Sequence, residues 1–282
     1  MTEPFPTTTW RLILSKPMPG ARNMAVDSAI LAGVEGGTSL PTLRLYRWDP
    51  PCLSLGYSQA YSDVDQDQLT ANNWDVVRRP TGGRAILHTD ELTYAVIGPK
   101  NDPRLAGSLM DSYRCISQAL FTALIQLGLP AEVHSGKNPN AQNQPVCFEN
   151  PSDFEITVEG KKIIGSAQAR KKASLLQHGS LPLTGDLTRI TQALKYETAS
   201  SRLEAGHLLL QKAATVHDIL GKEISWDRAA KLFADSFATT LNLNLEEGEL
   251  SSDEKKLALE LESEQYGHPG WTRRTSHKRT AF

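Results

Sequence analysis

The sequence predicts an α+β domain, with mixed and antiparallel β-sheets flanked by helices and a helical C-terminal part. Short alternating segments typical of strands are interspersed with segments that have the 3.6-residue period of helices. No unit of 20 to 50 residues repeats, which argues against a solenoid or a propeller. The later segments are mostly of the helical kind. Strands that precede and mix with helices in this way favour the α+β class.

Length, composition and net charge are those of an ordinary globular protein. With 282 residues, of which 39% are hydrophobic, the chain can bury a substantial core in one large domain or two small ones. The net charge of −2 comes from 30 basic and 32 acidic residues. The electrostatic field of so small a net charge attracts neither nucleic acid nor an anionic membrane.

The lack of a recognisable targeting segment predicts a cytoplasmic protein. No apolar run approaches the length of a membrane span, and the first residues lack the basic and apolar parts of a signal peptide. The cysteines are three (Cys52, Cys115 and Cys147), far apart and without Cys-x-x-Cys spacing. We therefore expect free thiols, and neither a disulfide framework nor a metal site.

Alternation and turn residues predict the strands. They fall at residues 10–14, 43–48, 53–56, 75–78, 85–87, 92–97 and 175–183. A hairpin is expected between 154–158 and 162–164, because Gly160 supplies the turn geometry between them. Between residues 135 and 145 the chain is rich in Gly, Asn, Gln and Pro, which is typical of a mobile surface loop.

Periodicity and capping residues predict the helices. A short helix is expected over residues 23–31, closed by Gly33, and the clearest one spans residues 109–127, ended by Gly128 and Pro130. Ser225 is a good cap for a helix with Trp226, Ala230, Phe233, Phe237 and Leu241 on one face. Ser251 and Glu254 form a capping box for a last helix that ends near Gly267. The tail over residues 273–282 is expected to be flexible.

The first segment that can carry chemistry is Arg-Arg-Pro-Thr-Gly-Gly-Arg-Ala-Ile-Leu-His, residues 78–88. Glycines in a turn let backbone N–H groups approach an anion or a carbonyl, and Arg78, Arg79 and Arg84 can pair with phosphate. A hairpin turn with solvated arginines explains the same residues, since Gly-Gly is a common hairpin signal.

Cys147 lies in the second segment, Pro-Val-Cys-Phe-Glu-Asn-Pro, between prolines and directly after the polar loop. A structural cysteine would sit on the face of a helix or strand, as Cys115 does beside Ile116. Reactive thiols occupy partly exposed, electropositive surroundings. The position of Cys147 therefore allows a nucleophile, although a lone cysteine is also an ordinary small apolar residue.

Residues 160–180 form the third segment. Lys162 falls where the second strand of the hairpin begins, and the small residues Gly165, Ser166 and Ala167 leave room for a ligand against the backbone. The other interpretation is a surface hairpin whose basic residues are merely solvated (Lys161, Lys162, Arg170, Lys171 and Lys172).

Together the three segments resemble the biotin/lipoate protein ligase superfamily, and within it the cysteine-dependent octanoyltransferases that resemble lipoate ligases. The resemblance covers nearly the whole chain. Further matching segments are Asn-Met-Ala-Val-Asp (23–27), Leu-Ser-Leu-Gly-Tyr-Ser-Gln (53–59), Glu-Leu-Thr-Tyr (91–94) and Trp271. The resemblance implies a biotin/lipoate ligase-like acyltransferase domain over residues 10–242 and a helical C-terminal extension over residues 243–282.

The resemblance also implies the roles of the site residues. It makes Cys147 the nucleophile and Lys162 the essential lysine, and it places two walls of an acyl tunnel at the other matching positions, which are Arg79, Gly82, Gly83, His88, Gly165, Ser166, Ala167 and His178. ATP-dependent lipoate ligases usually carry a third glycine in the turn where this chain has Arg84. This departure favours the transferase branch.

The implied reaction moves an octanoyl group from octanoyl-acyl carrier protein to a lysine of a lipoyl-domain protein, such as glycine cleavage H protein or an E2 lipoyl domain. A cysteine at its usual pKa of about 8.5 is mostly thiol at neutral pH, so a cation such as the Lys162 ammonium is expected to stabilise the thiolate. Acyl transfer from a thioester to an amine is downhill. No cofactor is therefore expected.

Three alternatives remain open. An ATP-dependent lipoate ligase would need ATP and magnesium but not Cys147. A lipoyl-domain amidotransferase would take its acyl group from another lipoylated protein, again through a cysteine. A catalytically silent module that only docks carrier proteins would form no acyl-enzyme.

Overall fold

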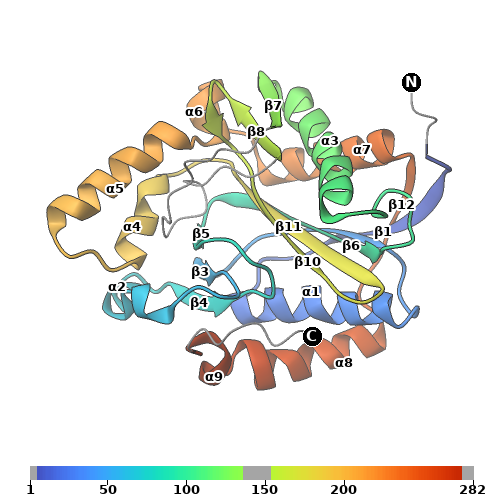
Figure 1. Cartoon of the computed structure of the whole chain (residues 1–282), viewed down its shortest axis with the longest axis horizontal. Helices are drawn as coiled ribbons and strands as arrows, with labels where there is room; N and C mark the ends of the chain where they lie inside the picture. The colour runs from blue at the N-terminus through green and yellow to red at the C-terminus, as the bar shows by residue number, and fades with distance from the viewer. Residues whose placement is uncertain (1–4, 136–153, 275–282) are drawn as a thin grey trace.

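A six-stranded mixed sheet forms the centre of the molecule (Figure 1). The computed structural model describes residues 5–135 and 154–274 of the chain. The order of the strands is β10-β11-β6-β2-β1-β12. Neighbours are antiparallel from β10 to β2, whereas β2, β1 and β12 run parallel. The strands are β1 (Thr8–Leu14), β2 (Thr42–Tyr46), β6 (Glu91–Pro99), β10 (Gly165–Arg170), β11 (Ser174–Pro182) and β12 (Leu243–Glu247).

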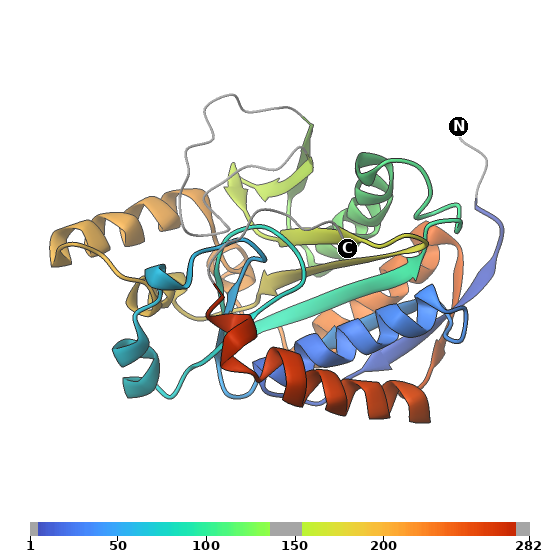
Figure 2. The ribbon, with the colours of Figure 1, turned by 60° about the horizontal axis from the view of Figure 1, so that its bottom comes forward.

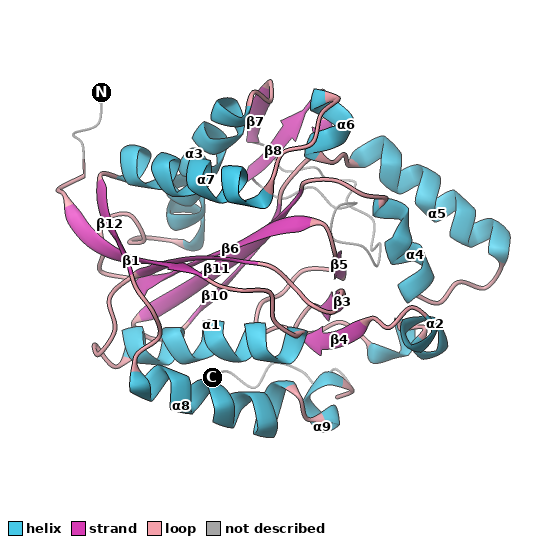
Figure 3. Cartoon of the chain, turned by 180° about the vertical axis from the view of Figure 1, so that it is seen from behind, coloured by secondary structure: helices cyan, strands magenta, loops and turns pink. Residues whose placement is uncertain are grey.

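Helices cover both faces of this sheet, as Figures 1 and 3 show. On one face α1 (Gly20–Glu35) packs against β6 and β11, and α8 (Ser252–Leu261) packs against α1. On the other face lie α3 (Leu109–Leu127) and α7 (Trp226–Leu241), which pack against each other. Tyr94 and Phe237 belong to the core on that second face, and Met24 and Ile30 to the core under α1. This three-layer arrangement buries the apolar stripe of each helix.

Two small sheets flank the central one. The first has the order β4-β3-β5, in which β4 (Asp75–Arg78) and β5 (Ile86–His88) both pair with β3 (Cys52–Leu55). The second has the order β7-β8-β9, built from β7 (Ala131–Ser135), β8 (Phe154–Val158) and β9 (Lys161–Lys162). Short helical elements complete the fold: η1 (Tyr61–Asp63), α2 (Gln66–Ala71), η3 (Leu187–Arg189), α4 (Ile190–Ala193), α5 (Ala199–Lys212) and α6 (Val216–Leu220).

The C-terminal helices fold back along α1 and end beside the first small sheet (Figure 2). After α8 the chain continues through the π-helical turn η4 (Glu262–Tyr266) into α9 (Pro269–Thr272). Arg78 joins α9 to the loop after β3. Its guanidinium, 0% exposed, donates to the carbonyl of Thr272 at 2.8 Å and to those of Gly56, Tyr57 and Gln59. The indole of Trp271 donates to the Arg78 carbonyl at 2.9 Å.

Most predicted elements are confirmed. The helix over residues 109–127 has the predicted bounds, with Gly128 at φ +93° as its C-cap. Ser225 caps α7, and Ser251 with Glu254 forms the capping box of α8. The expected hairpin forms between β8 and β9, although β9 ends at Lys162. The predicted loop lies, apart from Ser135, outside the described residues, as does the tail after Arg274.

Two expectations about elements were wrong. Gly33 does not close the first helix, which runs on to Glu35; a Cβ at Gly33 would stand 2.2 Å from the Ser39 hydroxyl, so close packing explains this glycine. Residues 78–88 do not form a hairpin, because β4 and β5 pair with β3 and not with each other. The proposed division at residue 242 stays a prediction. β12, which follows it directly, is a strand that pairs with β1.

No helix in the described ranges combines the length and the apolar character that crossing a membrane requires.

Candidate active site

A narrow pocket lies between the central sheet and the first small sheet. Its wall combines strand and turn residues from both sheets with one residue of α1: Met24, Tyr46, Trp48, Ser54, Arg79, Ile86, His88, Thr93, Gly165, Ser166, Ala167, His178, Gly179 and Ser180. We call it the acyl pocket. Ser166 and Ala167 are partly exposed, whereas Tyr46 and Trp48 are buried. The pocket therefore opens near β10 and closes near the end of β2.

One wall is made of small residues on two paired strands. Gly165, Ser166 and Ala167 of β10 lie opposite Ser180, Gly179 and His178 of β11. A Cβ at Gly179 would stand 2.5 Å from the Gly165 carbonyl oxygen and 2.7 Å from a ring carbon of Tyr94. Only glycine fits there, because such contacts would force the two strands apart. A flat wall of this kind suits a slender apolar group lying against the backbone.

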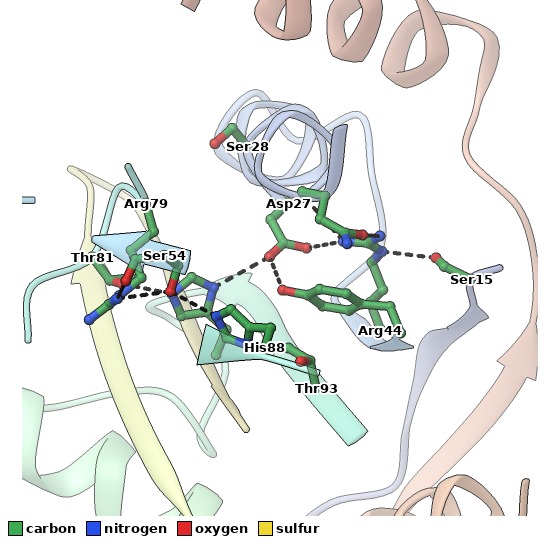
Figure 4. Close-up of polar contacts among 12 residues, drawn as sticks. Ser15, Asp27, Ser28, Arg44, Ser54, Arg79, Thr81, His88 and Thr93 are labelled. Atoms are coloured by element: carbon green, nitrogen blue, oxygen red, sulfur yellow. Dashed lines mark hydrogen bonds and ion pairs between the residues drawn. The ribbon is translucent and has the colours of Figure 1, made fainter. Parts of the chain in front are cut away.

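Arg79, at the start of the turn between β4 and β5, lines the opposite wall (Figure 4). It fixes the turn, since its guanidinium donates to the carbonyls of Gly82 and Arg84 at 2.8 and 2.7 Å and to Ser54 on β3. Gly83 has φ +90°, and a Cβ on it would stand 2.9 Å from Arg79 and 4.0 Å from the Cβ of Ala167. The Gly-Gly turn thus reaches across to β10 at the mouth of the pocket.

A buried chain of polar groups lies behind the acyl pocket (Figure 4). Asp27 on α1 forms an ion pair with Arg44 at 2.6 Å and accepts a hydrogen bond from the Tyr46 hydroxyl at 2.9 Å. His178 faces the same carboxylate through Nδ1 at 3.4 Å, and its Nε2 lies 2.6 Å from the Thr81 hydroxyl. The chain therefore connects helix α1 to the turn that carries the two glycines.

Charge and burial fix the protonation states in this chain. Burial raises the pKa of Asp27, but the Arg44 charge and the contacts with His178 outweigh it and hold that pKa below its usual value. Burial lowers the pKa of His178 despite the neighbouring carboxylate. His178 is therefore neutral at pH 7, with Nδ1–H pointing at Asp27 and Nε2 accepting from Thr81.

A second polar cluster surrounds His88. Its Nδ1 lies 2.6 Å from Glu91, and its Nε2 lies 2.7 Å from the Ser54 hydroxyl. Glu91 also accepts hydrogen bonds from Thr93 and Ser180. The Trp48 ring stacks on the imidazole with centroids 4.0 Å apart. With its polar atoms satisfied in this way, His88 is held in place in the pocket wall.

Lys162 is the last residue of β9 and precedes the β10 wall of the acyl pocket in the sequence. It is 6% exposed, and three residues along the chain it is followed by Gly165, the first wall residue of β10. Its carbonyl accepts a hydrogen bond from the Ala214 N–H, which ties β9 to the segment after α5. The interpretation of this lysine as a solvated surface residue is wrong, because it is buried. Arg170 is not free either, since it donates to Gly107, Ser108 and Ser112.

Cys147 lies outside the described residues. The segment that contains it starts after β7 and ends before β8, and Ser135 pairs with Phe154 across its base. β8 in turn pairs with β9, where Lys162 lies. Both ends of the segment are therefore anchored on the sheet that carries the lysine. Of the other cysteines, Cys52 is buried on β3 and Cys115 is half-buried on α3. Burial raises the pKa of the Cys115 thiol to about 11.

The pocket brings together six of the predicted site residues, namely Arg79, His88, Gly165, Ser166, Ala167 and His178. Gly82 and Gly83 lie in the turn beside it, and a Cβ placed on Gly82 would meet no atom within 4 Å. Arg78 and Arg79 are buried, so the interpretation as solvated arginines is wrong for both. Sequence reasoning missed the residues that close the pocket, including Met24, Tyr46, Trp48 and Ile86. Met24 lies in the matching segment 23–27 and Ile86 in the segment 78–88, whereas Tyr46 and Trp48 had given no signal as site residues.

Fold and site together describe an α+β domain with a narrow pocket between two sheets and a buried lysine three residues from the pocket wall. The family described as the lipoyl protein ligase A/B catalytic domain matches residues 19–238. The chain belongs to this family.

Curated relatives define the activity more closely than the family does. The chain is 39% identical over 259 residues to the octanoyltransferase LipM of Kyrpidia tusciae, covering 90% of this chain and 94% of that one. It is 36% identical to the octanoyltransferase LipM of Bacillus subtilis over 273 residues, covering 93% and 97%. These relatives confirm the prediction of an acyltransferase enzyme that acts in protein lipoylation.

Solved structures confirm the predicted α+β class. An archaeal bipartite lipoate protein ligase from Thermoplasma acidophilum, studied with its E2 lipoyl domain, superposes with a TM-score of 0.81 at 26% identity, covering 97% of this chain and 100% of that one. A lipoate-protein ligase A bound with ATP superposes with a TM-score of 0.77 at 27% identity, covering 95% and 99%.

Proposed function

We propose that this enzyme transfers an octanoyl group from octanoyl-acyl carrier protein to a lysine of a lipoyl-domain protein, through a thioester on Cys147 and without a cofactor. The observation that carries the proposal is the acyl pocket in a chain whose curated relatives are octanoyltransferases. Burying the chain contributes roughly 0.8 kcal/mol per methylene, so a medium-length acyl group is held firmly. The neighbouring T. acidophilum ligase was studied with an E2 lipoyl domain, which supports an acceptor of that kind.

In the first step the Cys147 thiolate attacks the carbonyl carbon of the donor thioester. A new carbon–sulfur bond forms, the bond to the carrier thiol breaks, and that thiol leaves as a thiolate that takes up a proton. In the second step the neutral lysine amine of the acceptor attacks the acyl-enzyme, and the amide forms as the Cys147 thiolate leaves. The amine gives up its proton to solvent or to a nearby base.

Lys162 acts in both steps. Its ammonium stabilises the thiolate before attack and the oxyanion that forms on the carbonyl oxygen during it. The lysine is buried and lies three residues from the pocket wall. A charge so fixed in a dry site stabilises an anion more strongly than one in water, because the surroundings screen it less.

Intact-mass spectrometry tests the proposal. After incubation with octanoyl-acyl carrier protein, the enzyme is expected to gain one octanoyl group, located on the peptide that contains Cys147. A Cys147→Ser variant is expected to transfer nothing. Cys115→Ser is the matched control, since Cys115 is a half-buried thiol on α3, and it is expected to keep the adduct. An adduct that persists in Cys147→Ser and disappears in Cys115→Ser contradicts the proposal.

The ATP-dependent ligase is the second candidate, because the solved neighbours are lipoate ligases, one of them bound with ATP. It predicts that Cys147→Ser keeps its activity with lipoate, ATP and magnesium. The amidotransferase alternative predicts that an octanoylated lipoyl domain is a better donor than the carrier thioester. Comparing the three donors with one acceptor separates the three activities.

A further inference from the structure

A second hollow lies behind one wall of the acyl pocket. We call it the side cavity. Its lining comes from the ends of β5, β6 and β11 and from η3, α4 and α5. Ile86 on β5 lines both hollows, and its side chain is 7% exposed. This buried isoleucine is therefore part of the partition between them.

The position of Ile86 on its strand explains why it lines the acyl pocket. Side chains alternate between the two faces of a strand, so Ile86 and His88 lie on the same face of β5. Ser54, which pairs with Ile86 across the small sheet, also lines the acyl pocket. On its other side Ile86 belongs to the hydrophobic cluster that includes Ile190 and Leu209, and these two residues line the side cavity.

Glu91 is the second residue of the partition. It lines the side cavity, and its carboxylate accepts hydrogen bonds from Thr93 and Ser180 and lies 2.6 Å from Nδ1 of His88. These contacts hold the carboxylate in place. The side chain of Ile86 can form no hydrogen bond, so packing alone keeps it there. Shortening Ile86 therefore opens the partition without leaving a buried polar group unpaired.

The inner end of the acyl pocket has little freedom to lengthen. Trp48 lies there, and its Nε1 donates to the Thr93 hydroxyl at 2.8 Å while its ring stacks on His88. A longer acyl chain cannot displace the indole without breaking both contacts. Such a chain can enter the side cavity only if Ile86 no longer closes the wall.

The side cavity is apolar where it meets Ile86. Ile190 and Leu209 are buried, whereas Asp90 and Asp186 are exposed and mark the side that faces solvent. A methylene chain that passed the partition would thus contact aliphatic side chains before it reached water. Each methylene buried in this way tightens binding about fourfold.

From these observations we propose that Ile86 sets the upper length of the acyl group that the enzyme accepts, because it closes the acyl pocket against the apolar part of the side cavity. The inference rests on the proposed function in taking the acyl pocket as the site of the acyl chain. It goes further in naming the residue that separates medium-length chains from long ones.

Binding of free fatty acids tests the inference without the transfer reaction. Octanoate and dodecanoate differ only in chain length, and both are used below the concentrations at which they form micelles. Calorimetry is expected to show that the full-length enzyme binds octanoate at least about tenfold more tightly than dodecanoate. In Ile86→Ala dodecanoate is expected to bind at least as tightly as octanoate, since its additional methylenes can enter the side cavity.

Ile190→Ala is the matched control. Ile190 is a buried isoleucine of the same hydrophobic cluster, and it lines the side cavity but not the acyl pocket. Removing the same atoms from it leaves the partition in place, so this variant is expected to keep the tenfold preference for octanoate. If a thermal melt shows that Ile86→Ala is unfolded, Ile86→Val is used instead and is expected to reduce that preference at least about twofold.

Transfer is measured separately, by the octanoyl adduct on the enzyme, so that the two ideas fail differently. Tighter binding of dodecanoate by the shortened Ile86 variant, with no octanoyl adduct on any cysteine, supports the inference and overturns the proposed transfer. An octanoyl adduct together with an unchanged preference in that variant overturns the inference alone. An equal gain in Ile190→Ala also overturns it, because a looser cluster and not an open partition would then admit the longer chain. If the wild type binds neither acid, the acyl pocket holds no acyl chain and the inference is wrong.

Discussion

Replacing Gly83 by alanine is expected to destabilise the turn at the mouth of the acyl pocket. At φ +90° an alanine is in the left-handed region, which costs roughly 1–2 kcal/mol. The added methyl group also stands 2.9 Å from the Arg79 guanidinium. Arg79 must then move, although it bonds Ser54, Gly82 and Arg84. For a chain of this size the backbone cost alone lowers the melting temperature by about 2–8 °C.

The neighbouring residue supplies the control. Gly82 does not have a positive φ, and a Cβ on it would meet no atom within 4 Å. Gly82→Ala is therefore expected to change the free energy of unfolding by no more than about 0.5 kcal/mol. Urea unfolding of both variants at pH 7 measures the difference. The explanation given for the turn is refuted if Gly83→Ala is as stable as Gly82→Ala.

Three further predictions concern the buried polar groups. Arg44→Met is expected to lower the free energy of unfolding by about 3–5 kcal/mol because it leaves the Asp27 carboxylate buried without its ion pair. Urea unfolding measures this loss. The double variant Arg44→Met with Asp27→Asn should recover part of it. Burial lowers the pKa of His178 from its ordinary value of 6.5. The unfolded chain therefore binds more protons than the folded one below that pH, and the free energy of unfolding falls as the pH falls through this range. In His178→Gln the free energy of unfolding, measured between pH 7 and 5, should depend less on pH, and an unchanged pH dependence would contradict a neutral imidazole. Burial, and after it the Arg274 charge, lowers the pKa of Arg78 to about 10, so the guanidinium is still charged at pH 8. Arg78→Met should therefore lower the free energy of unfolding at that pH by at least about 2 kcal/mol, because buried carbonyls lose their donor. Limited proteolysis after residue 272 should also become faster than in the wild type.

Much of the fold could be predicted because local signals and packing agree. In α3 and α7 the apolar residues repeat at helical spacing, and each helix has a side-chain cap at its start. α5 was missed for the opposite reason. Leu203 and Leu210 are 66% and 41% exposed, and Gly206 lies inside the helix, so its sequence shows no clear apolar stripe. β12 reads Leu-Asn-Leu-Glu-Glu and pairs on one edge only, and such a short edge strand gives little periodic signal.

The site could be predicted only in part. The two glycine-containing segments carry recognisable turn and small-residue patterns, and the structure brings both to one pocket. The polar chain behind them joins Asp27, Arg44, Thr81 and His178, which come from four separate parts of the sequence. Nothing in a single sequence pairs such residues, because their contacts depend on the arrangement of strands in the central sheet. Ile86 lies in the 78–88 segment, but only the fold shows that its side chain lines the pocket.

The hydrogen bonds from Arg78 to Thr272 and from Trp271 to Arg78 link residues almost two hundred positions apart. On the ribosome, the loop after β3 stays without this support until residue 272 has emerged from the exit tunnel. The loop that leads away from β3, and the start of the turn after Arg78, are therefore among the last parts of the fold to gain their contacts during synthesis.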